Sequence, residues 1–286
     1  MCVKMEKNHP QIERFRGIIN GQLKIFGNGK YDAAMNMAID EAMMRLSDQN
    51  GTFMLRTYEF IKPSVVLSFS DSTQNILSQS DIDVTRRISA GKPIYIDKNV
   101  LAYSITGPMH SPYGFSPTDL HKVLGSIISD SIERTVKCDI RLSLGNAYSI
   151  RYLGLPIVGN GQHIGKMHSF LYHGVIALGP WDHDNIRKVL RINDSDLQTM
   201  QQLPSISQIG NYKKDIQIYR SELCANIIDV ATEYFKTYSV VCDQNKSKII
   251  EDAKIIAEQK YKANEWIART DIPLRVDSRF CLLYEG

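Results

Sequence analysis

Three histidines lie close together in the sequence and have the side chains best suited to bind a metal ion. His163, His168 and His173 follow one another at intervals of five residues. That interval matches neither the period of a helix nor the alternation of a strand, so the three imidazoles would share no face. We therefore expect no metal site here, and we interpret His173 as a residue within a strand.

Other patterns that would reveal a reaction are absent from the sequence. It contains no Gly-x-x-x-x-Gly-Lys-Ser/Thr phosphate loop, no Gly-x-Gly-x-x-Gly fingerprint and no Gly-x-Ser-x-Gly elbow. The cysteines form no Cys-x-x-Cys pair and no Cys-His zinc spacing; they are Cys2, Cys138, Cys224, Cys242 and Cys281. That usage is typical of a reduced, intracellular protein.

Charge and hydropathy exclude two classes of partner. The chain has 34 Lys and Arg residues against 31 Asp and Glu residues, a formal net charge of +3 over 286 residues. A domain that depends on phosphate contacts is usually far more basic, so we expect no nucleic acid. The first residues contain no apolar run typical of a signal peptide, and no run is long enough to cross a membrane. We expect a cytoplasmic protein.

The elements that must position any site follow from hydrophobic spacing. Apolar residues at helical spacing follow Asp32, a good N-cap, and predict a helix to about residue 46. The sequence Ser116-Pro117-Thr118-Asp119 predicts the start of a second helix, which its apolar face carries to about residue 135. Further helices are predicted over 182–190, 221–238 and 246–267.

Short β-rich runs lie between these helices. Strands are predicted over 55–58, 64–69, 93–96, 100–105, 170–178 and 279–284, with a hairpin of 148–152 and 155–158 and a loop over 85–92. The order lacks the regular alternation of a doubly wound sheet. It predicts an α+β fold with a mixed or antiparallel sheet flanked by helices, preceded by a polar arm over residues 1–24.

Four segments carry a further signal through their order along the chain. They are AAMNMAIDEAMMRL, RRISAGKPIYIDKNVLAYSI, GNAYSIRYLGLPIVGNGQ and FLYHGVIAL, and KIIAEQKYKANEW follows them near the end. Together they resemble lipoate–protein ligase A and its octanoyltransferase relatives over roughly residues 30–268. The resemblance implies that residues 25–286 form the catalytic domain of that family. Too few residues follow Ala268 for the accessory domain of many lipoate ligases. Either a separate accessory chain is needed for activation, or the chain only transfers a preformed adenylate or carries out no chemistry.

The resemblance implies a chemistry as well as a fold. The family activates lipoate or octanoate with ATP and Mg²⁺ as an acyl-adenylate, then passes the acyl group to a lysine of a lipoyl-domain protein. A glycine-rich loop lets main-chain N–H groups approach the phosphate. A lysine on the hairpin stabilises charge on the reacting oxygens, and an apolar tunnel takes the acyl chain.

The match is partial at the level of residues. Acyl or nucleotide binding is assigned by resemblance to Arg87, Ser89, Gly91, Lys92, Asn146, Gly159, Gln162 and His173. Within those motifs, Ala90 and Lys92 replace the glycines that flank Gly91, Ile96 replaces a histidine and Ala147 replaces an aspartate.

Pro156 occupies the position of the family's catalytic lysine. Proline has neither a charge nor an N–H donor, so it cannot take over that role. Lys166, just past the hairpin, is our candidate substitute, and Lys92 in the loop is the other nearby lysine; the alternative for Lys166 is a solvated loop residue. One branch of the family uses a cysteine near position 141, but the closest thiol is Cys138, so an acyl-cysteine enzyme is not favoured.

Two hypotheses of different class follow. The first is a lipoate or octanoate ligase or transferase that modifies a lipoyl domain. The second is a catalytically degenerate relative that binds an acyl ligand, a lipoyl domain or a partner ligase, because the reactive centre is altered while the scaffold motifs persist. A biotin ligase is a third option, less favoured because the Arg-Arg-x-Ser loop resembles the lipoate branch.

Overall fold

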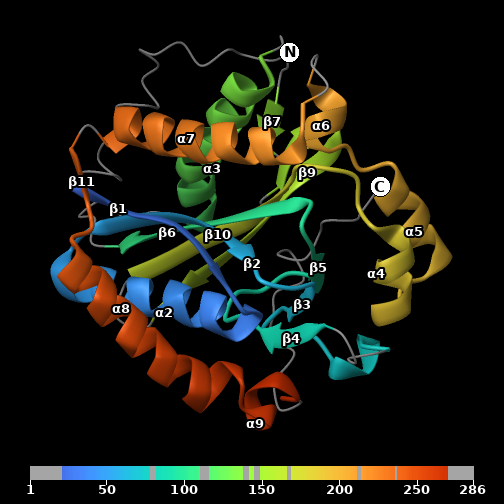
Figure 1. The fold of residues 1–286 in the computed structure, drawn as a ribbon, viewed down its shortest axis with the longest axis horizontal. Coiled ribbons are helices and arrows are strands. Elements are labelled where there is room, and N and C mark those ends of the chain that lie inside the picture. The colour runs from blue at the N-terminus through green and yellow to red at the C-terminus, as the bar shows by residue number, and fades with distance from the viewer. Residues whose placement is uncertain are drawn as a thin grey trace.

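A mixed sheet forms the centre of the molecule (Figure 1). The computed structural model describes residues 21–77, 82–109, 116–137, 142–144, 149–165, 169–210, 214–235 and 237–269. In these residues eight strands follow the order β11-β1-β2-β6-β10-β9-β8-β7. Their bounds are β1 Leu23–Tyr31, β2 Phe53–Phe60, β6 Val100–Pro108, β7 Leu142–Leu144, β8 Ser149–Tyr152, β9 Leu155–Ile164, β10 Ser169–Ala177 and β11 Tyr238–Val240. Pairing is parallel from β11 to β2 and antiparallel from β2 to β7.

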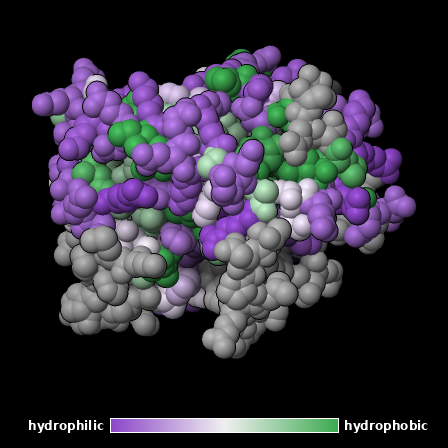
Figure 2. Space-filling view, turned by 90° about the horizontal axis from the view of Figure 1, so that it is seen from below, coloured by the Kyte–Doolittle hydropathy of each residue, from purple (hydrophilic) through white to green (hydrophobic). Residues whose placement is uncertain are grey.

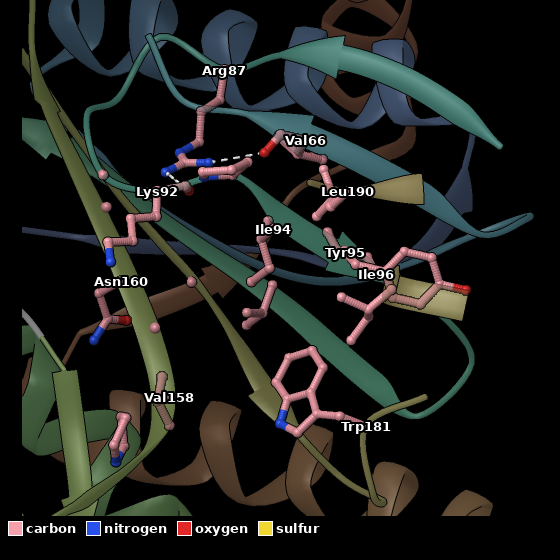
Figure 3. A pocket seen from close by; sticks show the side chains of 18 of the residues that line it. Val66, Arg87, Lys92, Ile94, Tyr95, Ile96, Val158, Asn160, Trp181 and Leu190 are labelled. Carbon is pink, nitrogen blue, oxygen red and sulfur yellow. Dashed lines mark hydrogen bonds between the residues drawn. The ribbon is translucent and has the colours of Figure 1, made fainter. Parts of the chain in front are cut away.

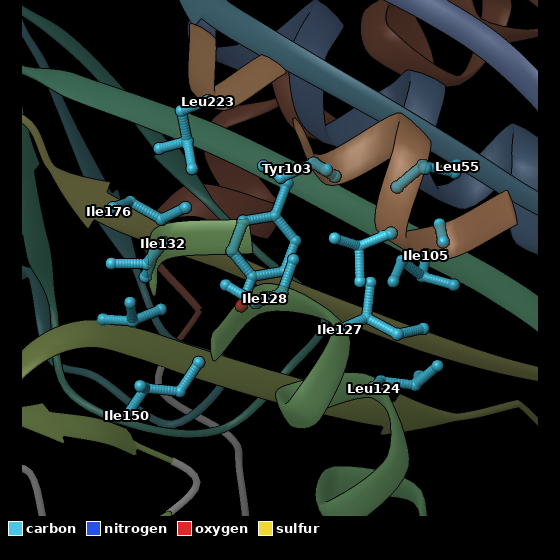
Figure 4. Packing of buried hydrophobic residues seen from close by; sticks show 14 of the residues in the cluster. Leu55, Tyr103, Ile105, Leu124, Ile127, Ile128, Ile132, Ile150, Ile176 and Leu223 are labelled. Carbon is cyan, nitrogen blue, oxygen red and sulfur yellow. The ribbon is translucent and has the colours of Figure 1, made fainter. Parts of the chain in front are cut away.

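Helices cover both faces of this sheet, which confirms the predicted fold class. On one face lie α3 (Pro117–Val136) and α7 (Ile216–Phe235), and on the other lie α2 (Ala33–Asn50) and α8 (Asp243–Ile256). In Figure 4 the Tyr103 ring of β6 lies among Ile128 and Ile132 of α3 and Leu223 of α7. The sheet therefore has two separate apolar cores, one on each face.

A small second sheet lies beside the main one. It pairs β4 (Asp83–Arg86), β3 (Ser64–Leu67) and β5 (Ile94–Ile96) in that order. Val65 and Tyr95 of this sheet pack against Ile186 of α4 (His183–Val189) in a third apolar cluster. The short helices are η1 (Thr73–Asn75), α5 (Asp194–Gln201), α6 (Ile206–Ile209) and α9 (Asn264–Ile267).

The predicted helix starts are confirmed at atomic detail. Asp32 Oδ1 accepts a hydrogen bond from the Met35 N–H, at 2.7 Å, so it caps α2. Ser116 and Asp119 form a reciprocal capping box at the start of α3. These signals are local in the sequence, which is why they could be predicted.

Several boundaries differ from the prediction because tertiary contacts override local pattern. The predicted loop over 85–92 begins as strand β4, which pairs in parallel with β3. The helix predicted over 246–267 is interrupted in the structure. Helix α8 ends at Ile256, a π-helical turn follows, η2 (Ala257–Tyr261), and α9 begins at Asn264. Strand β1 begins at Leu23, and its pairing with β11, more than 200 residues later, has no sequence signal. The predicted strand over 279–284 lies outside the described residues.

The outer surface carries most of the charged side chains. Along α8, only Ile249, Ala253 and Ile256 are buried, at helical spacing, and the lysines and acids between them face outward. Figure 2 shows a mostly hydrophilic face with small separate apolar groups. In the part of the chain described, no helix is both long and apolar enough to cross a membrane.

A two-residue turn joins β8 to β9. Tyr152 pairs with Leu155, and the residues between them have positive φ angles, 50° at Leu153 and 84° at Gly154. Positive φ at both central residues is the type I′ turn, which suits the twist of a hairpin and favours Asn-Gly. Leu153 adopts this conformation at a cost, with its side chain 80% exposed.

Replacing Leu153 by asparagine should stabilise the hairpin. Asparagine tolerates the left-handed region, so the Leu153→Asn variant should gain about 0.5–1 kcal/mol in free energy of unfolding. Urea unfolding monitored by circular dichroism measures the gain. Leu77→Asn is the control, since Leu77 is also exposed, at 51%, without a positive φ. An equal change in both variants would contradict the turn assignment.

Candidate active site

A cavity of about 380 Å³ lies between the main sheet and the small sheet. That volume falls within the range of small-molecule sites. Its walls come from β9 and β10 on one side, from β3, β5 and the following loops on the other, and from α4. Figure 3 shows Val158, Ile94, Ile96 and Trp181 around the space, with Lys92 and Arg87 at one side and Leu190 at the other. Most of the lining is apolar.

The loop after β4 borders the cavity, and Arg87 holds its shape. The Arg87 guanidinium donates hydrogen bonds to the carbonyls of Val66 (3.1 Å), Ala90 (3.1 Å) and Lys92 (2.9 Å). Gly91 has a φ of 123°, and a Cβ there would lie 2.7 Å from Arg87 Nη2. Glycine is therefore required at 91 both by the backbone conformation and by the close guanidinium.

A chain of hydrogen-bonded polar side chains links this loop to α2. Arg87 Nε donates to Ser89 Oγ at 3.0 Å, Ser89 Oγ lies 2.6 Å from His173 Nε2, and His173 Nδ1 lies 3.1 Å from Asp40 Oδ2. Because an ionised carboxylate only accepts hydrogen bonds, we assign the His173 proton to Nδ1 and the Ser89 hydroxyl as donor to Nε2. Both ring nitrogens are thereby engaged.

Asp40 is the charged centre of this network. Its carboxylate accepts hydrogen bonds from Arg56 Nη2 (2.7 Å) and Arg56 Nε (2.9 Å) and from the Tyr58 hydroxyl (3.1 Å). Burial by itself would raise the pKa of Asp40, but the Arg56 charge and the His173 hydrogen bond outweigh it, so the pKa is lowered. Burial beside that carboxylate raises the pKa of Tyr58. Asp40 is therefore a buried anion, paired with Arg56.

The order Ser89–His173–Asp40 matches the order of a hydrolase triad, but its surroundings do not. Ser89 is fully buried and does not line the cavity, whereas His173 does. A Cβ at Gly161 would lie 2.6 Å from Ser89 Oγ, so β9 packs directly over the hydroxyl. A substrate carbon cannot reach it, and we assign the network a positioning role.

The structure brings together five of the residues expected to bind substrate. Arg87, Gly91, Lys92, Gly159 and His173 all line the cavity. Their substrate contacts stay a prediction, as do those of Ser89 and Gln162, which do not line it.

Gln162 instead donates through Nε2 to the Pro117 carbonyl at 3.2 Å. Asn146 and Lys166 lie outside the described residues, as do Ala147, His168 and Cys138. The candidate catalytic role of Lys166 therefore stays a prediction.

Pro156 is a buried residue of the cavity wall, near the start of β9. The sequence prediction placed it at the family's lysine position, and the structure places that position on the cavity. An uncharged pyrrolidine ring thus stands where a cation would be expected.

Sequence reasoning missed the groups that support His173. Asp40 belongs to the Asn-x-Ala-x-Asp-Glu pattern of the first segment, which predicted a helix and contributed to the family resemblance without assigning a role to Asp40. Arg56 is a charged residue in the buried part of strand β2, a pattern that indicates a buried ion pair. Those two signals together could have identified the network.

The described residues offer few ligands for a metal ion. Among the residues described, no three His, Cys, Asp or Glu side chains gather closely enough to hold an ion. Asp71 is the one acidic side chain among the described residues of the cavity wall.

Comparison with known families now gives the site a context. Residues 32–213, more than half of the chain, match the family model of the lipoyl protein ligase A/B catalytic domain. The chain belongs to this family. The resemblance seen in the sequence is thus confirmed. No curated protein matches the chain.

Solved structures of lipoyl protein ligases share the fold at low identity. A crystal structure of lipoate-protein ligase A bound with ATP has a TM-score of 0.67 and 18% identity, covering 88% of this chain and 99% of that one. A bi-partite lipoate protein ligase with its E2 lipoyl domain, from Thermoplasma acidophilum, has a TM-score of 0.69 and 18% identity, covering 90% and 99%. P. falciparum LipL1 in complex with lipoate has a TM-score of 0.66 and 13% identity, covering 88% and 75%.

Neutralising Asp40 should destabilise this lipoyl protein ligase domain strongly. Asp40→Asn leaves the Arg56 charge buried without a partner, so we expect a loss of about 3–5 kcal/mol in free energy of unfolding. Urea unfolding measures it. Glu258→Gln is a matched control, because the Glu258–Lys262 pair is exposed and should change stability by about 0.5 kcal/mol or less. A loss of unfolding free energy as small as that of the control variant would contradict the buried pairing of Asp40 with Arg56.

Acid should narrow the difference in free energy of unfolding between Asp40→Asn and wild type. Since the pKa of Asp40 is lowered in the folded state, its stabilising effect is complete above the unfolded value of about 3.9 and is lost as pH falls through the folded value. The difference in unfolding free energy between the two proteins should therefore stay constant from about pH 7 to pH 5 and begin to narrow below about pH 4. A constant difference would show that Asp40 is not the ionised partner.

Proposed function

We propose that the chain attaches lipoate or octanoate to a lysine of a lipoyl domain, through an acyl-adenylate. The observation that carries the proposal is the apolar cavity bordered at one side by the loop of Gly91 and Lys92. An amphiphilic acid has the same division into an apolar chain and a charged head. Membership of the lipoyl protein ligase family supports the same substrate class.

The apolar walls suit a saturated chain of this length. Burial of a methylene stabilises binding by about 0.8 kcal/mol, so an octanoyl chain gains roughly 5 kcal/mol. Ile94, Ile96 and Val158 contribute side chains without polar atoms to these walls. The chain would lie among them with its carboxylate toward the loop.

ATP would provide the activation. A substrate carboxylate oxygen attacks the α-phosphorus, a C–O–P link forms and pyrophosphate leaves. The unprotonated amine of the acceptor lysine then attacks the acyl carbon, AMP leaves and the amine releases a proton to water. His173 has both nitrogens engaged, so it orients the loop through Ser89 and takes no proton in this scheme.

Mg²⁺ would accompany the nucleotide. It is commonly bound through one or two carboxylates together with phosphate oxygens, and Asp71, which lines the cavity, would supply one. Asp71 Oδ2 accepts from the Ser68 N–H at 2.6 Å, which fixes the carboxylate at the cavity wall. When bound, the ion offsets the negative charge of the phosphates.

The acceptor would be a lipoyl-domain protein, with a separate accessory chain for the activation step. Support comes from the T. acidophilum structure, which describes a bi-partite ligase with its E2 lipoyl domain. The second candidate function is a catalytically degenerate binding protein, and the buried Pro156 in the cavity wall favours it.

Intact-mass spectrometry of a lipoyl domain tests the proposal. After incubation with this chain, Mg-ATP and lipoate or octanoate, we expect a mass increase of one acyl group, and a lipoyl domain with its acceptor lysine changed to arginine should show none. A parallel sample contains preformed lipoyl-adenylate. Modification only in that sample would mean transfer without activation.

No modification in either sample would contradict the proposal. In that case Pro156→Lys separates the remaining alternatives, because it restores a cation to the cavity wall. Acylation gained only in this variant would identify a degenerate but otherwise intact site. Continued inactivity, with acyl ligands still bound in calorimetry, would favour the binding protein.

A further inference from the structure

Strand β5 forms one wall of the cavity, and different parts of the site lie at its two ends. The loop of Gly91 and Lys92 comes directly before this strand, and Asn99 lies three residues after it. Ile94 and Ile96 both line the cavity, and alternate residues of a strand share one face. The three residues of β5 span about 10 Å, comparable with an extended eight-carbon chain.

Asn99 fixes the backbone of the segment that follows β10, and this segment carries Trp181. The Asn99 carbonyl accepts a hydrogen bond from the Gly179 N–H at 3.2 Å, and Asn99 Nδ2 donates to the Pro180 carbonyl at 2.9 Å. On the other side, the Trp181 carbonyl accepts from the His183 N–H at 3.1 Å. Trp181 is thus held at the end of β5 that lies opposite to the loop after β4.

The indole of Trp181 lies where the two sheets meet. It packs both against the apolar core on the α2 face of the main sheet and against the third apolar cluster, beside the small sheet. Figure 3 shows the indole across the space from Arg87, with its six-membered ring directed toward Ile94 and its nitrogen turned away from that side. The end of the cavity away from the loop is therefore apolar and aromatic.

An acyl chain whose carboxylate lies toward the loop would extend along β5 to this ring. Val158 of β9 and Val175 of β10 line the cavity from the main sheet, so the chain would be enclosed by apolar side chains. A longer chain would meet the Trp181 ring, whose backbone is hydrogen-bonded on both sides. Closely packed walls accommodate even an extra methylene at a cost.

We propose that Trp181 sets the length of the acyl chain that the cavity accepts, with an upper limit near eight carbons. The ring acts by occupying the space into which further methylenes would extend, and it takes no part in the reaction. Medium-chain acids would thus be separated from long-chain ones. This inference rests on the proposed function, because it takes an acyl acid as the ligand and directs its carboxylate toward the loop.

Calorimetric titration with hexanoate, octanoate, decanoate and dodecanoate tests the inference without requiring turnover. In wild type, affinity should rise about fourfold for each added methylene as far as octanoate and should then stop rising. In Trp181→Ala, which removes the ring, decanoate should bind about tenfold more tightly than octanoate. Trp181→Phe keeps an aromatic ring in the packing and repeats the test if the alanine variant does not fold. Its ratio of decanoate to octanoate affinity should also exceed that of wild type.

Tyr238→Ala is the matched control, since Tyr238 is an exposed aromatic residue of β11 outside the cavity lining. It should leave the dependence of affinity on chain length unchanged. A loss of folding stability cannot imitate the expected result, because tighter binding of a longer acid is a gain.

Two results would overturn the role of Trp181 while leaving the acyl site in place. One is the same dependence on chain length in wild type and in the Trp181 variants, and the other is wild-type affinity that continues to rise to dodecanoate. Weaker binding of Mg-ATP by Trp181→Ala, with an unchanged preference among the acids, would also overturn it and would assign the ring to the nucleotide. Binding of no acid by wild type would overturn the proposed function itself.

Discussion

The buried carboxylate of Asp40 is the constraint on which the site depends. A carboxylate without water must be paired and hydrogen-bonded, and here Arg56, Tyr58 and His173 satisfy it from β2 and β10. That requirement ties α2 to the centre of the main sheet. Through His173 it also reaches Ser89, so the position of the cavity loop follows from the pairing of one buried charge.

Two arginines hold the backbone of the loop region through main-chain carbonyls. Arg86 is buried under it and donates to the carbonyls of Ser68, Asp71 and Ile267, which joins the loop region to the end of the described chain. Arg87 closes the turn at Gly91. Arg86 and Arg87 thus both donate hydrogen bonds to main-chain carbonyls, and Lys92, which follows the turn, lines the cavity.

The fold of the family persists here although most side chains differ from those of its solved members. Membership in the lipoyl protein ligase family and TM-scores of 0.65 or more to its solved members, at 18% identity or less, mean that core packing is retained while most side chains differ. Apolar positions tolerate exchange if volume and pattern persist.

The sequence by itself determined the elements whose signals are local. Caps at Asp32 and Ser116 and the apolar face of α3 define helices within a few residues, and the ordered motifs indicated the family. Tertiary structure alone decided the pairing of β1 with β11, the strand at β4 and the place of Pro156 on the cavity wall. Strand partners and buried charges meet across long chain separations, and no local pattern encodes which residues will face each other.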